Sequence, residues 1–220
     1  ADTRTVVIED TPELPLESLQ SVGRDVQGLR TGTGHGPEMT PAALRTALRL
    51  GDGALVVGEI RGEEASVLYE AMRVGANANA VLGTIHGDGA ADVYERVVTD
   101  LGVDPSSFAA TDLVVTIQAV PTPEGRDRRI SRIEEVIYDG PDVRFEPLFE
   151  TDGTAARPTG RIDQGESRFV HGLSGPDGAY ADVRASIAER TEALGTLATD
   201  GRTEPGEVAG AYASRIRSNR

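Results

Sequence analysis

Polar side chains capable of acid–base or metal chemistry follow four short apolar runs of the chain. The runs are VVI at 6–8, LVV at 55–57, AVLGTI at 80–85 and LVVTI at 113–117, and the residues that close them are Glu9, Asp10, Glu59, His86 and Gln118. Continuous apolar runs indicate strands covered on both faces, as in a parallel sheet, and ligands of such sheets bind beyond the carboxyl ends of the strands. We therefore expect these five polar residues to share one edge of a sheet.

Three acids and a histidine at one edge favour nucleotide hydrolysis. Carboxylates can hold Mg²⁺ through its water ligands and orient an attacking water, and a histidine can donate a hydrogen bond to a transferring phosphoryl group. Each acid alone could equally start a turn, and His86 could be a core histidine bonded to the backbone. The residue types alone do not show which of Glu9 and Glu59 would hold Mg²⁺ through its waters and which would orient the attacking water.

The elements that must position these residues alternate in type. Helical patterns with start and stop signals occupy residues 40–51, 62–75 and 90–101, between the apolar runs. Alternating residues at 129–138 and 143–149 predict an antiparallel hairpin. Strand, helix and strand in succession predict an α/β fold with a mostly parallel sheet and flanking helices.

The second half of the chain divides into three parts. We expect the α/β domain to span residues 1–150, a linker to span 151–165 and a helical appendage to span 166–220. Within the appendage a strand or turn is expected at 168–171, followed by amphipathic helices at 176–197 and 204–217.

Composition excludes several classes of protein. The 220 residues include 36 Asp or Glu and 22 basic residues, all of them Arg, so the net charge is −14 and no lysine-based phosphate loop or Schiff base exists in this chain. Such acidity argues against nucleic-acid binding and fits a high-salt cytoplasm, where surface carboxylates are screened. There is no cysteine, no apolar run long enough to span a membrane, and no signal-peptide pattern in the first residues. The chain begins within a predicted strand, as a fragment would.

Three of these segments resemble the ring-forming ATPases of type II and type IV secretion systems, type IV pili and the archaellum. VVIEDTPEL at 6–14 is similar to their Asp box, LVVGEIRGEEA at 55–65 to their Walker B region, and GTIHG at 83–87 to their His box. The strand DLVVTIQAV at 112–120 and the RRISRIEEV hairpin continue the match. The resemblance points to the archaeal, halophilic branch and implies a RecA-like P-loop NTPase fold.

The resemblance also implies roles for individual residues. Glu59 would be the Walker B acid that supports the water shell of Mg²⁺, Glu9 would polarise the attacking water, and His86 would contact the γ-phosphate of ATP. Asp10 and Glu13 would complete the Asp box. Arg61 would lie beside Glu59 and either pair with Glu63 or Glu64 or reach across a subunit interface.

One departure from the family is large, because the Walker A loop G-x-x-x-x-G-K-[ST] does not occur in this chain. In the family this loop lies one strand–helix unit before the Asp box, so it would precede Ala1. We therefore expect the chain to be the later half of such an ATPase, inactive by itself, with its Walker A portion supplied in cis or in trans.

The resemblance implies a homo-oligomer, most simply a hexamer, in the cytoplasm at the inner face of the membrane. It would act with an integral membrane platform protein on pilin-like subunits and use Mg²⁺ and ATP. The main alternative is a non-catalytic remnant or accessory ring subunit. A third interpretation treats Glu9, Glu59 and His86 as a free-standing metal hydrolase site.

Overall fold

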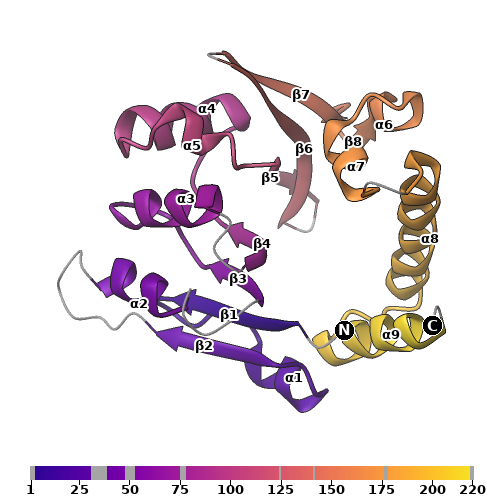
Figure 1. The fold of residues 1–220 in the computed structure, drawn as a ribbon. Helices are drawn as coiled ribbons and strands as arrows, with labels where there is room; N and C mark the ends of the chain where they lie inside the picture. The colour runs from indigo at the N-terminus through magenta and orange to yellow at the C-terminus, as the bar shows by residue number, and fades with distance from the viewer. Residues whose placement is uncertain are drawn as a thin grey trace. The chain divides into compact units, whose positions relative to one another are not determined.

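The computed structural model describes residues 3–30, 39–47, 53–74, 78–123, 125–140, 142–175 and 178–218. The chain forms two compact units, one made of Ala1–Ile85 with Glu192–Arg220 and the other of His86–Thr191. Figure 1 shows the helices and strands of each unit in chain order.

The first unit contains a parallel sheet, as the apolar runs predict. Its strands are β1 (Arg4–Glu9), β2 (Val26–Arg30), β3 (Gly53–Val57) and β4 (Ala78–Gly83), in the order β2-β1-β3-β4. Val6, Val7 and Ile8 of β1 are all buried, which requires cover on both faces of the sheet. The α/β class predicted from the sequence is therefore confirmed.

Among the described residues, the helices that belong wholly to this unit are α1 (Leu16–Ser21), α2 (Met39–Ala47), α3 (Glu64–Val74) and α9 (Pro205–Ser218). Helix α2 contacts β1, β2 and α3, and α1 contacts β2 and α9. The patterns at 40–51 and 62–75 correspond to α2 and α3, and residues 48–52 and 75–77 lie outside the described part of the chain. Leu44 of α2 and Leu68 of α3 supply the buried apolar stripes.

The second unit begins with helices and continues as an antiparallel sheet. The helices are α4 (Ala90–Glu95), the π-helix η1 (Arg96–Asp100) and α5 (Pro105–Phe108). The strands are β5 (Leu113–Thr122), β6 (Gly125–Asp139), β7 (Asp142–Thr151) and β8 (Ala156–Pro158), in the order β5-β6-β7-β8. The expected hairpin is thus β6 and β7.

Strand β5 differs from the prediction in its sheet. It pairs antiparallel with β6 and takes no part in the parallel sheet of β1, β3 and β4. The short connection between β5 and β6 explains why this pair is antiparallel, because a parallel pair needs a crossover of about a dozen residues or more. Gln118 lies inside this antiparallel strand, and its amide donates to Asp88 at 2.8 Å. The expectation that it lies at one edge with Glu9 and Glu59 stays a prediction.

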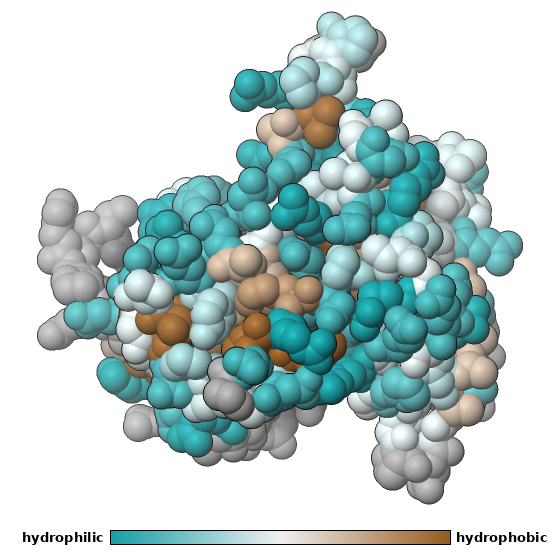
Figure 2. Space-filling view, turned by 90° about the horizontal axis from the view of Figure 1, so that it is seen from above, coloured by the Kyte–Doolittle hydropathy of each residue, from teal (hydrophilic) through white to brown (hydrophobic). Residues whose placement is uncertain are grey.

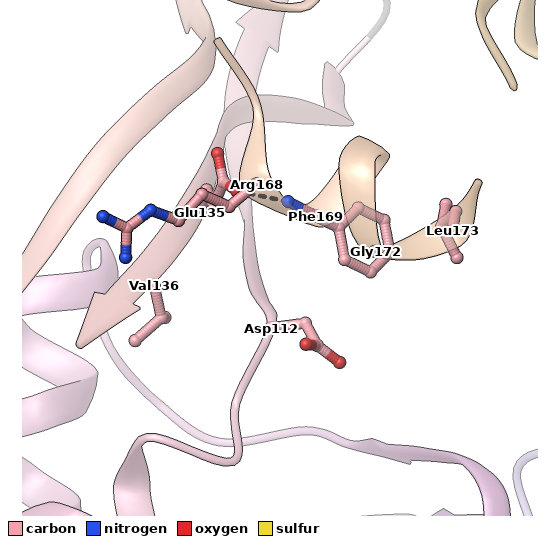
Figure 3. A pocket seen from close by; sticks show the side chains of 7 residues that line it. All are labelled: Asp112, Glu135, Val136, Arg168, Phe169, Gly172 and Leu173. Carbon is pink, nitrogen blue, oxygen red and sulfur yellow. Dashed lines mark hydrogen bonds between the residues drawn. The ribbon is translucent and has the colours of Figure 1, made fainter. Parts of the chain in front are cut away.

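The remaining elements of the second unit are α6 (Arg161–Gln164), α7 (Arg168–Leu173) and most of α8 (Tyr180–Thr199), which continues into the first unit. The segment expected as a strand or turn at 168–171 is the helix α7. Its first turn is capped twice: Ser167 accepts from the backbone N–H of Val170 at 3.2 Å, and Glu135 accepts from Phe169 at 2.5 Å (Figure 3). The expected linker at 151–165 includes β8 and α6.

Candidate functional site at the carboxyl edge of the parallel sheet

Two of the predicted glutamates lie on neighbouring strands at one edge. Strands β1 and β3 pair with Ile8 opposite Val57, so Glu9 lies beside Gly58, and Glu59 follows. The Gly58 N–H donates to the Ile8 carbonyl at 2.8 Å. A Cβ at Gly58 would come within 3.2 Å of that carbonyl oxygen and 3.3 Å of Cγ of Glu9, so the close approach of the strand ends favours glycine here.

The carboxylate of Glu9 organises the turn that follows β1. The residue is only 7% exposed, and its Oε1 accepts from the backbone N–H groups of Glu13 and Leu14, each at 3.0 Å. Glu13 itself is exposed and contributes its N–H to this arrangement. Glu9 therefore fixes the backbone of the turn that follows β1.

An ion pair connects the turns after β1 and β3. Arg61 binds the carboxylate of Glu59 and lies 3.9 Å from Asp10 Oδ2. The hydrogen bond and charge of Glu59 raise the pKa of Arg61 above its ordinary value. The side chain of Arg61 thus joins both acidic segments within the same chain. Its ion-pair partner is Glu59, whereas the sequence offered Glu63 or Glu64, or a contact across a subunit interface.

Glu64 holds the turn after β3, a role that the sequence did not reveal. It is buried, and its Oε1 accepts from the backbone N–H groups of Arg61 and Gly62 at 2.5 and 2.8 Å. A glutamate three residues after the start of a helix often accepts from the backbone N–H at that start, as Glu64 does from Arg61. This capping pattern was the signal in the sequence that could have predicted its role. Glu64 holds the turn that carries Glu59, as Glu9 holds the turn that carries Asp10.

Thr84 connects the end of β4 to the same turn. Its hydroxyl donates to the Gly58 carbonyl, and its own carbonyl accepts from the Ile60 N–H at 2.8 Å. His86 follows two residues later and is the first residue of the second unit, with an exposed side chain. The structure therefore brings together Glu9, Asp10, Glu59 and Arg61, while the contact of His86 with them stays a prediction.

The donor chemistry of this edge fits one part of a Mg-nucleotide site. Carboxylate oxygens of Glu59 and Asp10 are the ligand type that Mg²⁺ and its waters prefer. Four backbone N–H groups of these turns are already bonded, those of 13 and 14 to Glu9 and those of 61 and 62 to Glu64. Among the described residues, no group of three or more His, Asp or Glu could hold a metal directly, so the free-standing metal hydrolase interpretation gains no support.

A hollow in the second unit is separate from these residues. It has a volume of about 320 Å³ and lies between the start of β5, the middle of β6 and helix α7 (Figure 3). Its walls are Asp112, Glu135, Val136, Arg168, Phe169, Gly172 and Leu173. Partial burial raises the pKa of the Asp112 carboxyl. None of the predicted catalytic residues contributes to this hollow.

The fold and this edge define a mixed α/β protein with an acidic site at the end of a parallel sheet. A family model for type II/IV secretion system proteins matches residues 1–138. The chain belongs to the type II/IV secretion system protein family.

Individual relatives match shorter stretches. An uncharacterized protein of Methanocaldococcus jannaschii, MJ1287, is 30% identical over 145 residues, which are 64% of this chain and 51% of that protein. The type IV pilus ATPase PilU of Pseudomonas aeruginosa is 29% identical over 105 residues, 45% of this chain and 26% of PilU. The chain thus spans about half, or less, of the curated relatives it matches.

Among solved structures, the ATPase DotB of Legionella pneumophila matches with a TM-score of 0.48 and 23% identity. The match covers 63% of this chain and 37% of DotB. None of the described helices is both long enough and apolar enough to cross a membrane.

Proposed function

We propose that this chain is the later half of a secretion or pilus-assembly ATPase that couples hydrolysis of Mg-ATP to assembly or export of pilin-like subunits. The observation that carries the proposal is the placement of Glu59 beside the end of β1, in a turn fixed by Glu64 and Thr84. Membership of the secretion family and the similarity to the pilus ATPase PilU support it.

In the proposed reaction the residues of this chain act on water and protons. Glu59 holds the water shell of a Mg²⁺ ion that carries the phosphates of ATP, and Arg61 keeps its carboxylate in place. Glu9 polarises the attacking water with the oxygen that does not hold the turn, and His86 donates a hydrogen bond to the γ-phosphate. Positioning and electrostatic stabilisation provide most of the acceleration in phosphoryl transfer, so fixed turns are suited to this task.

The phosphate cradle belongs in this proposal to a Walker A portion, in cis or in trans. The open edge of the parallel sheet supports this, because β4 is its last described strand and Leu82 is 57% exposed there. Parallel sheets are normally buried on both faces, so a further strand–helix unit beside β4 would cover this surface.

The proposed assembly is a homo-oligomer, most simply a hexamer, in the cytoplasm. It works at the inner face of the membrane with an integral membrane platform protein. The excess of acidic residues and the absence of lysine support an origin in a high-salt, archaeal cytoplasm.

A second candidate function is a non-catalytic ring subunit that keeps the fold but does not hydrolyse ATP. The observation that favours it is that Glu9 and Glu64 already accept hydrogen bonds from the backbone N–H groups of residues 13, 14, 61 and 62, so these four groups are not free to bind a phosphate.

The test begins with the intact mass of the native polypeptide from its source cells, compared with 23.2 kDa. Hydrolysis of Mg-ATP is then measured in the purified native assembly for wild type, Glu59→Gln and the matched control Glu63→Gln, whose side chain is exposed. We expect Glu59→Gln to lower the rate roughly a hundredfold or more and Glu63→Gln to leave it unchanged. Equal rates for wild type and Glu59→Gln would refute the motor, and no hydrolysis by the wild-type assembly would favour the non-catalytic subunit.

A further inference from the structure

The segment that follows His86 is held by side chains of the antiparallel sheet. Asp88 accepts a hydrogen bond from the amide of Gln118, on β5, at 2.8 Å. Two residues further along the chain, the backbone N–H of Ala90 donates to Oε2 of Glu134, on β6, at 2.8 Å. Two neighbouring strands therefore fix the chain two to four residues beyond His86.

The close packing of this segment depends on two glycines. A Cβ at Gly87 would come within 2.7 Å of Cγ2 of Val93, in α4. A Cβ at Gly89 would lie 2.9 Å from Nη1 of Arg132 and 3.3 Å from Oε2 of Glu134, and the φ angle of Gly89 is +109°. Another residue at Gly89 would therefore be strained as well as crowded. The two glycines allow the backbone to lie directly against α4 and β6.

A second set of hydrogen bonds holds the chain just before His86. The carbonyl of Thr84 accepts from the backbone N–H of Ile60 at 2.8 Å, in the turn that carries Glu59. Residues 84–89 form neither a helix nor a strand. The contacts on either side of His86 therefore fix the backbone that carries it.

We propose that Gln118 and Glu134 are positioning residues, which hold His86 in place for its contact with the γ-phosphate. The inference deepens the proposed function and rests on it, because it concerns the same histidine. Neither residue touches the nucleotide, and each acts through the backbone of 88–90. A misplacement of about 1 Å can cost an enzyme about a hundredfold in rate. Loss of one of the two hydrogen bonds leaves the other in place, so we expect a smaller loss, of about tenfold.

The experiment has to separate positioning from a role in stability alone. The side chains of Asp88 and Gln118 are exposed, and hydrophilic residues cover most of the face drawn in Figure 2. Water therefore competes for polar groups at the surface of this chain, and a hydrogen bond that water can replace contributes little to global stability. We expect Gln118→Ala to keep the urea midpoint of wild type while it lowers the rate of hydrolysis.

The test measures kcat and KM for Mg-ATP in the purified native assembly. Gln118→Ala and Glu134→Ala should each lower kcat about tenfold and leave KM unchanged, because the contact of the histidine is made in the transition state. Glu134→Gln keeps an oxygen that can accept from Ala90 and should retain most of the rate. The matched controls are Gln164→Ala and Glu95→Ala, exposed residues of the same unit, and they should keep the kcat of wild type.

An exchange of donor and acceptor tests the hydrogen bond between Asp88 and Gln118. Gln118→Glu alone places a second carboxylate against Asp88 and should lower kcat at least as much as Gln118→Ala. Gln118→Glu combined with Asp88→Asn restores a hydrogen bond between an amide and a carboxylate of the same lengths, so it should recover most of the wild-type rate. A combined variant as slow as Gln118→Glu would overturn the positioning role of Gln118.

A double-mutant cycle decides whether the two residues act through His86. In chains that carry His86→Ala, Gln118→Ala and Glu134→Ala should have no further effect, because the side chain to be positioned is gone. A further loss by the same factor as in wild type would mean a structural role and overturn the inference. Wild-type kcat for Gln118→Ala and Glu134→Ala, beside a slow His86→Ala, would overturn it too. A His86→Ala assembly as fast as wild type, or a wild-type assembly without hydrolysis, would refute the proposed function itself, and the inference with it.

Discussion

Substitution of Glu9 separates its structural role from its proposed chemical one. Oε1 of this buried carboxylate accepts two backbone hydrogen bonds of 3.0 Å, from Glu13 and Leu14. Glu9→Ala removes both bonds, whereas Glu9→Gln keeps an amide oxygen that can accept them. The two variants should therefore differ clearly in stability.

The size of the difference follows from the charge of the acceptor. Hydrogen bonds to a charged group contribute about 1.5–3 kcal/mol each, and neutral ones about 1 kcal/mol. Glu13 is exposed, so water can reach the turn and recover part of the loss. We expect the free energy of unfolding to fall by about 3 kcal/mol in Glu9→Ala and by about 1 kcal/mol in Glu9→Gln.

Urea unfolding followed by far-UV circular dichroism measures both values, since the chain has no tryptophan. Glu13→Ala is the control, because it removes a neighbouring exposed carboxylate and leaves the two hydrogen bonds intact. If Glu9→Ala and Glu9→Gln lose the same stability, or if Glu9→Ala behaves like Glu13→Ala, the assignment of Glu9 as the cap of this turn is refuted. In the native assembly Glu9→Gln should still lower ATP hydrolysis, because a neutral amide cannot polarise water as a carboxylate does.

Four further predictions concern stability and are measured by the same unfolding assay. Glu64→Ala should cost about 3 kcal/mol, because two hydrogen bonds to a buried carboxylate are lost, and a cost near zero would contradict the role of Glu64. Phe108→Ala should cost about 3–5 kcal/mol, because this fully buried ring leaves a cavity. Hydrogen bonds from Arg168 and Arg144 hold the pKa of Asp139 below its ordinary value. The ionised carboxylate therefore stabilises the fold above about pH 4, and this stabilisation is lost as the pH falls. Asp139→Asn should remove this contribution to the pH dependence of the free energy of unfolding. Added KCl should raise the urea midpoint by screening the 36 acidic side chains, and a midpoint that falls with salt would contradict this.

The parallel sheet was predictable because β1, β3 and β4 contain continuous apolar runs that demand burial on both faces. Strand β2 was not predicted, since its sequence VQGLR mixes polar residues and glycine and resembles a loop. Its pairing with β1 is decided by tertiary contact, which overrides the weak local preference for a strand.

Helix α7 was mistaken for a strand or turn because it is six residues long and its first turn depends on a distant side chain. Glu135, on β6, accepts from the N–H of Phe169, 34 residues away. No pattern along the chain reports such a contact. Local signals were limited to Ser167, which is a favoured N-cap residue.

At the candidate site, the ends of the strands predicted that Glu9 and Glu59 lie close together. They did not predict that backbone N–H groups of the two turns are hydrogen-bonded to carboxylates of the same chain. Two carboxylates, Glu9 and Glu64, each accept two N–H groups from the turns that a phosphate would otherwise approach. Breaking those bonds to admit a phosphate would place a third negative charge beside Glu59 and Asp10, at an edge where Arg61 is already paired with Glu59. Phosphate binding in the proposed motor therefore has to come from N–H groups and cations outside these two turns, and the turns serve to keep the water-directing carboxylates in place.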